Sequence, residues 1–430
     1  MNFGQIMQNE YQNACNQFYG ETPIDVHQVG YDPSHVLGLH SVNPANDAEF
    51  QYINHIRSQV ATSMHRGHID YIGDLVRPVI PYSEDPTRYA MNGLVVDKIW
   101  AQISRNGLQN FYTQESLQTL IDQVCLHDYR CFQLEWGIQN LDVATDLAIL
   151  AMYDIILIGD DSGSMNHTDY GEQMNRWGLL KVMVQTISFW ATLMDDDGID
   201  VRMFNTNIGK DGDNISSPQS VDQLFNLCRP GGLTPMGQSI TRTIEEKRIL
   251  RHLKHGKLRK PVLFLIITDG VPSNREAVID AIKNCRSKAK RSIYGKRALA
   301  FGFCQIGKDK EAQKWLEKID SHKVIGNSVD CTSEYADEAS EFRQAGNELT
   351  PGTYVAKVLL GPVNALYDQA DEKSAKSSDY YSPFVAPSYY ERPTFVSTEA
   401  FSQIMPAVTS DQQYAVSGKT SCASAPPYYA

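Results

Sequence analysis

Short apolar segments alternate with longer amphipathic segments over residues 151–367, and this alternation limits the possible fold more than any other feature of the chain. The apolar segments are as long as buried strands and cover residues 153–159, 200–204, 262–268 and 298–303, with weaker candidates at 323–325 and 329–331. Helical periodicity covers residues 171–193, 236–254, 275–286 and 308–319, and two further segments, 335–345 and 353–366, close the domain. The pattern is typical of βαβ units. We therefore predict an α/β fold with a doubly wound, mainly parallel sheet.

The rest of the 430-residue chain divides into three parts by composition. Residues 1–46 are rich in Asn, Gln, Tyr and His and predict a mobile arm. Residues 47–145 predict a small helical unit in front of the α/β domain, and one helical face in it carries Leu117, Leu120, Ile121 and Val124. Residues 368–430 are rich in Ser, Tyr and Pro, which predicts a disordered tail.

The chain shows no sign of a membrane or a secretory destination. Its longest apolar runs are strand-sized, so we expect no transmembrane segment. The first residues have neither the basic start and apolar run of a secretory signal nor an Arg-rich transit segment. The eight cysteines are scattered without a CxxC pair, which is typical of reduced thiols. These features predict a cytoplasmic protein.

Three polar side chains follow the first predicted strand at the spacing Asp-x-Ser-x-Ser, namely Asp160, Ser162 and Ser164. Thr234 lies in a glycine-rich loop that opens a helix, and Asp269 directly follows the strand predicted at 262–268. Because ligands bind at the carboxyl ends of the strands in such sheets, we expect these side chains to converge. Hydroxyls and carboxylates without His or Cys favour a hard divalent ion, Mg²⁺ or Mn²⁺, over zinc.

In this order, the five residues resemble the metal-ion-dependent adhesion site of von Willebrand factor type A domains. The resemblance covers residues 151–360, about half of the chain, and a looser similarity extends to intracellular, fungal-type members of the family. It implies that Ser162, Ser164 and Thr234 are hydroxyl ligands of the ion. It also implies that Asp160 and Asp269 bind the ion directly or through water. An ion held mainly by neutral hydroxyls stays electron-poor, so we expect it to accept an Asp or Glu side chain from a protein partner.

Each of these residues also has a purely structural interpretation. Thr234 precedes Pro235 and is a normal helix N-cap. Asp269 and Gly270 form a common turn sequence, and Ser162 and Ser164 have the chemistry to cap the following helix. Asp161 stays outside the predicted ligand set, because its position is compatible both with the site and with solvent.

The sequence carries no pattern typical of catalysis. HExxH, GxSxG, a P-loop and a GxGxxG after a strand are all absent from it. We therefore predict a binding protein, not an enzyme, whose contact with a protein partner depends on a divalent cation. A metal-assisted hydrolase is the weaker alternative, because the sequence offers no plausible general base for it.

Positive charge is concentrated in one segment of an acidic chain. The net charge is −12, yet residues 247–297 hold fifteen Lys and Arg against three acidic residues, a net +12. One interpretation is a solvated face with cations near helix C-termini. The other is a surface for phospholipid headgroups, RNA or an acidic partner. An adaptor that binds an anionic surface is therefore the alternative function.

The C-terminal residues hold a separate recognition motif. Pro426, Pro427 and Tyr429 match the Pro-Pro-x-Tyr ligand of WW domains. A proline-bearing tail needs little ordering to dock as a polyproline II helix in an aromatic groove. We therefore predict a WW-domain protein as a second partner.

Overall fold

The computed structural model describes residues 4–5, 7–8, 48–63, 70–194, 197–344, 347–364 and 367. The predicted arm, 1–46, lies outside the described residues except at 4–5 and 7–8. The predicted tail, 368–430, lies outside them entirely, and so do Pro426, Pro427 and Tyr429 of the WW-ligand motif. All described residues belong to one unit of the chain.

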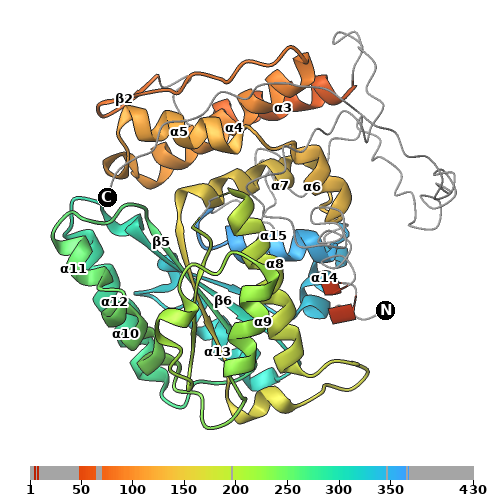
Figure 1. Ribbon diagram of the computed structural model, residues 1–430, viewed down its shortest axis with the longest axis vertical. Coiled ribbons are helices and arrows are strands. Elements are labelled where there is room, and N and C mark those ends of the chain that lie inside the picture. Colours follow the sequence, from red (N-terminus) through yellow and green to blue (C-terminus); the bar gives the residue numbers. More distant parts are fainter. Residues whose placement is uncertain are drawn as a thin grey trace, which may run out of the picture. The chain divides into compact units, whose positions relative to one another are not determined.

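Five parallel strands form the main sheet (Figure 1). They are β3 (Asp154–Gly159), β4 (Asp200–Met203), β5 (Val262–Thr268), β6 (Leu299–Gln305) and β7 (Val329–Thr332). Their order across the sheet is β4-β3-β5-β6-β7, and every neighbouring pair is parallel. The prediction of an α/β fold with a parallel sheet is confirmed. Of the two weaker strand candidates, 329–331 lies in β7, whereas 323–325 is a turn.

Helices cover both faces of this sheet, as the doubly wound prediction requires (Figure 1). They are α8 (Arg176–Met194), α9 (Pro218–Leu227), α10 (Met236–Glu246), α11 (Ile249–Lys254), α12 (Arg275–Lys290), α13 (Lys310–Asp320), α14 (Tyr335–Gln344) and α15 (Pro351–Leu360). β5 is buried along its whole length, and its alternate residues enter two separate cores. Leu265 packs in the core of α8 and α15, and Phe264 packs in the core of α10 and α12. The continuous apolar run of β5 therefore reflects burial on both faces.

The helix predicted over residues 236–254 is two helices. α10 ends at Glu246, and α11 begins at Ile249, directly after Arg248, whose φ of 53° is in the left-handed region. Lys247 lies at the break and forms ion pairs with Asp200 (2.5 Å) and Asp213 (2.8 Å). Helical periodicity continues across the break, so the sequence pattern alone does not reveal it.

The predicted helical unit contains α3 (Ala48–Ser63), α4 (Pro86–Asn106), α5 (Gln114–Val124), α6 (Tyr129–Glu135) and α7 (Leu141–Asp146). The four residues predicted to share one helical face, Leu117, Leu120, Ile121 and Val124, are all buried in α5. A small hairpin, β1 (Tyr71–Ile72) and β2 (Leu75–Val76), also occurs here, and the sequence did not predict it.

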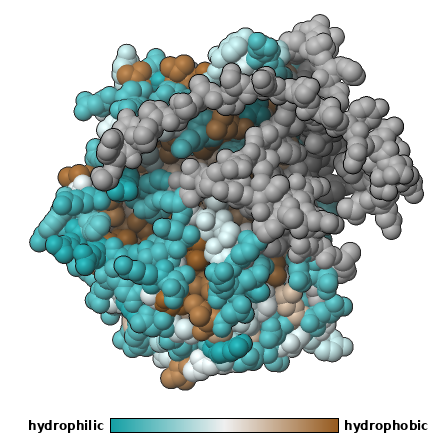
Figure 2. Space-filling view, in the orientation of Figure 1, coloured by the Kyte–Doolittle hydropathy of each residue, from teal (hydrophilic) through white to brown (hydrophobic). Residues whose placement is uncertain are grey.

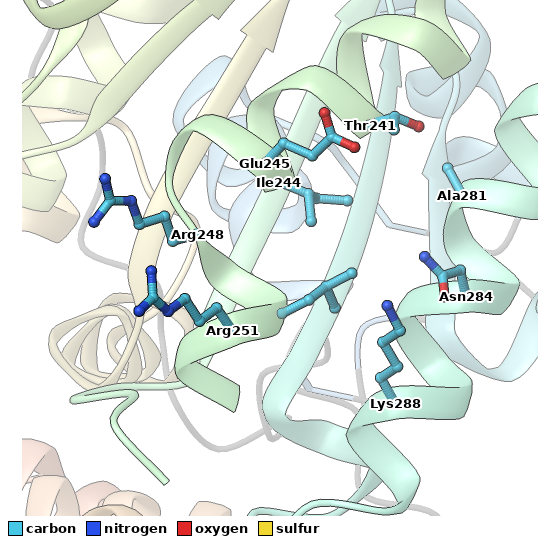
Figure 3. Close-up of a pocket in the computed structure, with 9 residues that line it drawn as sticks. Thr241, Ile244, Glu245, Arg248, Arg251, Ala281, Asn284 and Lys288 are labelled. Atoms are coloured by element: carbon cyan, nitrogen blue, oxygen red, sulfur yellow. The ribbon is translucent and has the colours of Figure 1, made fainter. Parts of the chain in front are cut away.

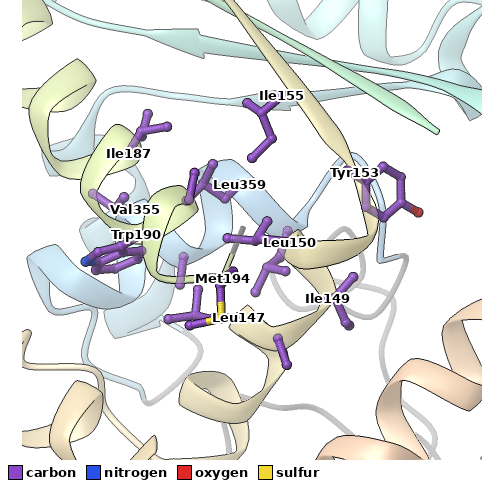
Figure 4. Close-up of a cluster of buried hydrophobic side chains, with 14 of the residues drawn as sticks. Leu147, Ile149, Leu150, Tyr153, Ile155, Ile187, Trp190, Met194, Val355 and Leu359 are labelled. Atoms are coloured by element: carbon purple, nitrogen blue, oxygen red, sulfur yellow. The ribbon is translucent and has the colours of Figure 1, made fainter. Parts of the chain in front are cut away.

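This helical unit shares one hydrophobic core with a face of the sheet. The 3₁₀-helix η4 (Leu147–Met152) connects α7 to β3. Figure 4 shows Leu147 and Leu150 of η4 facing Trp190 of α8 and Val355 of α15, and all of these side chains are buried in one cluster. The core therefore continues from the helical unit into the α/β domain.

Within the described parts of the chain, no helix is long and apolar enough to cross a membrane. α4 has 21 residues, but it carries Arg88, Asp97, Lys98 and Arg105.

Candidate metal site

The strand order places a topological switch point at the carboxyl ends of β3 and β5. After β3, the chain proceeds to β4 on one side and then returns to β5 on the other side of β3. At such a switch point the two connections leave the sheet in opposite directions, and ligands bind in the crevice between them. Asp160 directly follows β3, and Asp269 directly follows β5. Both predicted carboxylates therefore lie at the switch point of the sheet.

Ser162, Ser164 and Asp269 form one hydrogen-bonded chain of side chains. The two serine hydroxyl oxygens lie 3.0 Å apart, and Ser164 Oγ donates to Asp269 Oδ1 over 2.9 Å. Both serines lie in the turn around the 3₁₀-helix η5 (Gly163–Asn166), which begins just after the end of β3. The fold thus brings a carboxylate from the end of β5 to hydroxyls that precede it by more than a hundred residues.

Asp160 is fully buried at the base of the same turn. Its Oδ1 accepts a hydrogen bond from the backbone N–H of Ser162 (2.8 Å), and its Oδ2 accepts one from the hydroxyl of Thr268 (2.6 Å). Burial raises the pKa of the Asp160 carboxyl to about 6, although these hydrogen bonds lower it. A nearby cation would therefore stabilise the charged form of Asp160.

The loop that carries Thr234 packs against this turn. The N–H of Gly163 donates to the carbonyl of Gly232 over 3.2 Å, and the N–H of Gly231 donates to the carbonyl of Asp161 over 2.8 Å. Gly232 has a φ of 84°, a conformation that favours glycine. Thr234 itself is half-buried, and within the described residues its hydroxyl forms no hydrogen bond with the other four predicted ligands. Three of the five predicted side chains are thus linked directly, Asp160 joins them through the backbone N–H of Ser162, and Thr234 is brought near them by its loop.

Arg176 is part of the site, and the sequence did not predict it. Its Nη1 donates to Asp269 Oδ2 over 2.8 Å, and its Nη2 donates to Asp169 Oδ1 over 2.6 Å. The Arg176 guanidinium lowers the pKa of Asp169. Gly307 leaves space for the Arg176 side chain, because a Cβ atom at position 307 would lie only 2.4 Å from Arg176 Nε. The pairing of Arg176 with Asp269 joins residues 93 positions apart, and no local motif indicates it.

Asp161 has a structural role, which the sequence left open. Its Oδ1 accepts from the N–H of Asn205 (2.7 Å), and its Oδ2 accepts from the N–H (2.8 Å) and the hydroxyl (2.5 Å) of Thr206. Asp161 is fully buried. Its carboxylate therefore holds the loop after β4 against the turn after β3.

The chemistry of the donor set fits a hard divalent ion. In the described part of the chain, no group of three or more His, Cys, Asp and Glu is arranged to hold a metal ion, so hydroxyls would have to be among the ligands. Four carboxylates, those of Asp160, Asp161, Asp169 and Asp269, border this region, and the Arg176 guanidinium contacts two of them. The excess of negative charge and the oxygen donors favour Mg²⁺ or Mn²⁺.

Comparisons with known proteins leave the family open. No protein-family model matches the sequence, and no curated protein matches it either. The resemblance to von Willebrand factor type A domains therefore stays a prediction from the sequence.

Proposed function

We propose that this chain is a von Willebrand factor type A-like protein that binds a protein partner through a divalent cation. The hydroxyls of Ser162, Ser164 and Thr234 would hold the ion, together with Asp160 and Asp269. When bound, the ion supplies a positive centre that attracts an Asp or Glu side chain of the partner. The observation that carries this proposal is the hydrogen-bonded chain from Ser162 through Ser164 to Asp269 at the switch point of the sheet.

Both carboxylates of the site are already held by donors of the protein. Arg176 and Ser164 donate to the two oxygens of Asp269, and Thr268 and Ser162 donate to those of Asp160. We therefore expect these carboxylates to support the ion mainly through water, because protein donors already engage their oxygens. Ligation mainly by neutral hydroxyls leaves the ion with a strong attraction for a further carboxylate.

Two large exposed side chains neighbour the site, which favours a protein partner. Leu233 is 74% exposed and directly precedes Thr234. Tyr170 is 99% exposed and directly follows Asp169, which Arg176 connects to Asp269. Exposed aromatic and aliphatic residues around a charged centre are typical of protein interfaces. The expected partner motif is therefore an acidic residue beside a large apolar one.

Selection from a random peptide library tests this function. Peptides retained by the wild-type protein in Mg²⁺ and released by EDTA are expected to share an Asp or Glu next to a large apolar residue. Ser164→Ala is expected to retain none of them. Peptides without an acidic residue, or retention that persists in EDTA, would contradict the proposal.

A substitution at Leu233 tests the apolar contact separately. Leu233→Ser is expected to weaken binding of a selected peptide about 10-fold, because a buried leucine contributes about 1.5 kcal/mol or more. Its Mn²⁺ affinity should stay that of the wild type. Val324→Ser is the matched control, because Val324 is 50% exposed and lies in the turn that precedes β7, toward the amino ends of the strands. Equal peptide affinities of the two variants would show that Leu233 makes no contact.

A further inference from the structure

Exposed cations gather at the end of the sheet opposite the candidate metal site, near the ends of α11 and α12 and in the loops that lead from these helices into β5 and β6. We call six of them the basic surface: Lys254, Lys257, Lys288, Lys290, Arg291 and Lys296. These loops enter β5 and β6 at their amino ends, whereas Asp269 follows the carboxyl end of β5. The basic surface is therefore separate from the metal site.

The two loops of the basic surface lie side by side. Tyr294 Oη, in the loop before β6, donates to the carbonyl of Leu258, in the loop before β5, over 2.9 Å. A Cβ atom at Gly256 would lie 3.1 Å from Ile293 Cδ1. Figure 2 shows a mainly hydrophilic surface over α11 and α12. The cations of both loops thus belong to one continuous surface.

The charge of this surface is not neutralised by the protein. Within the described residues, none of the six cations takes part in an ion pair, and Arg291 bonds only to the carbonyl and hydroxyl of Ser287. Of the three acidic residues of the segment 247–297, Asp269 is buried at the candidate metal site and Asp280 pairs with Lys283. The third, Glu276, lies in the first turn of α12, at the opposite end of that helix from Lys288 and Lys290. A face that only solvates a protein usually mixes both signs of charge. An excess of one sign indicates an anionic ligand.

Ile293 distinguishes between the kinds of anionic ligand. It is 64% exposed and lies between Arg291 and Lys296. An exposed aliphatic residue among cations is typical of proteins that dock on a bilayer and insert an apolar side chain among the headgroups. RNA-binding surfaces instead present aromatic rings for base stacking. Tyr294, the aromatic residue of this loop, is buried and stacks on Phe111 at 4.2 Å between ring centroids, so the surface favours a membrane.

A cavity of about 370 Å³ adjoins the basic surface between α10, α11 and α12. Figure 3 shows Lys288 on α12 and Arg251 on α11 at one end of it, and Glu245 on α10 at the other. Ile244 and Ala281 contribute an apolar lining. A phosphate group is therefore expected at the Lys288 end, away from Glu245.

We propose that the basic surface docks this protein on an anionic phospholipid bilayer, with Ile293 inserted among the headgroups. Each cation near such a bilayer strengthens binding by about 1 kcal/mol at moderate ionic strength, or about 5-fold. Six cations and one inserted isoleucine are sufficient for reversible binding to an anionic membrane. Binding to a membrane of zwitterionic lipid alone is expected to be weak, because the attraction is electrostatic.

Sedimentation with lipid vesicles tests the proposal. The full chain, kept in EDTA to inactivate the metal site, is mixed with vesicles of phosphatidylcholine alone or with added phosphatidylserine. Binding is expected only with phosphatidylserine and should fall steeply as salt increases. Lys254→Gln/Lys288→Gln/Lys290→Gln should weaken it about 100-fold. Ile293→Ser should weaken it about 5-fold with the salt dependence unchanged.

Two matched variants make the result specific. Lys310→Gln/Lys314→Gln/Lys318→Gln removes the same charge from an exposed face of α13, and Leu227→Ser replaces a leucine that is 59% exposed at the end of α9. Both should bind like the wild type. Equal losses in the test and control variants, or no binding to phosphatidylserine vesicles, would overturn the proposal. Binding of a single-stranded RNA oligonucleotide in place of the vesicles would assign the surface to RNA.

Discussion

Lys98→Met is expected to lower the free energy of unfolding by about 3–5 kcal/mol. The Lys98 ammonium on α4 lies 2.5 Å from Asp142 Oδ1 and 2.8 Å from Asp146 Oδ1 on α7, and all three side chains are at most 6% exposed. Without it, two buried carboxylates face each other with no cation between them. Urea denaturation at neutral pH measures the loss.

A double substitution separates the charge from the packing. Methionine retains the apolar length of the lysine stem, so the loss in Lys98→Met should come mainly from the unpaired carboxylates. Lys98→Met/Asp142→Asn is therefore expected to recover part of the lost stability, because it removes one of the two charges. If Lys98→Met unfolded at the same midpoint concentration of urea as the wild type, the ion pairs of Lys98 with Asp142 and Asp146 would not stabilise the contact of α4 with α7.

Asp161→Ala is expected to lower the free energy of unfolding by about 2–4 kcal/mol. The substitution removes the acceptor for the backbone N–H groups of Asn205 and Thr206 and for the Thr206 hydroxyl. These donors would lose their partner beside a fully buried side chain. Chemical denaturation measures the change, and the loop after β4 should exchange its amide hydrogens faster.

Two variants make this result interpretable. Asp161→Asn retains one oxygen of the same size and place, so we expect about half of the loss. Ser164→Ala removes a hydroxyl from the candidate metal site and should change stability by less than about 1 kcal/mol in the absence of metal. If Asp161→Ala were as stable as Ser164→Ala, the carboxylate of Asp161 would have no structural role.

The strands and four of the five site residues could be placed from the sequence because local pattern and position determine them. An apolar run such as β5 identifies a strand buried on both faces, and residues that follow β3 and β5 must meet at one edge of a parallel sheet. Asp160, Ser162, Ser164 and Asp269 are indeed linked by hydrogen bonds. Their role as metal ligands stays a prediction.

The features that the sequence did not predict depend on contacts between distant residues. Arg176 reaches Asp269 from the first turn of α8, and the choice of this partner is determined by the packing of two separate loops. The left-handed conformation of Arg248 interrupts a continuous helical pattern. The exposure of Ile293 beside the buried Tyr294 likewise depends on a distant contact, because Tyr294 stacks on Phe111 of the helical unit.

We propose that the turn after β3 and the end of β5 hold a divalent cation. Calorimetric titration of Mn²⁺ and Mg²⁺ into the wild type and into Asp160→Ala/Ser162→Ala tests this site, with circular dichroism to show that both proteins are folded. We predict binding of both ions to the wild type and no binding to the double variant. Absence of binding to the wild type, or the same binding to a folded double variant, would contradict the metal site.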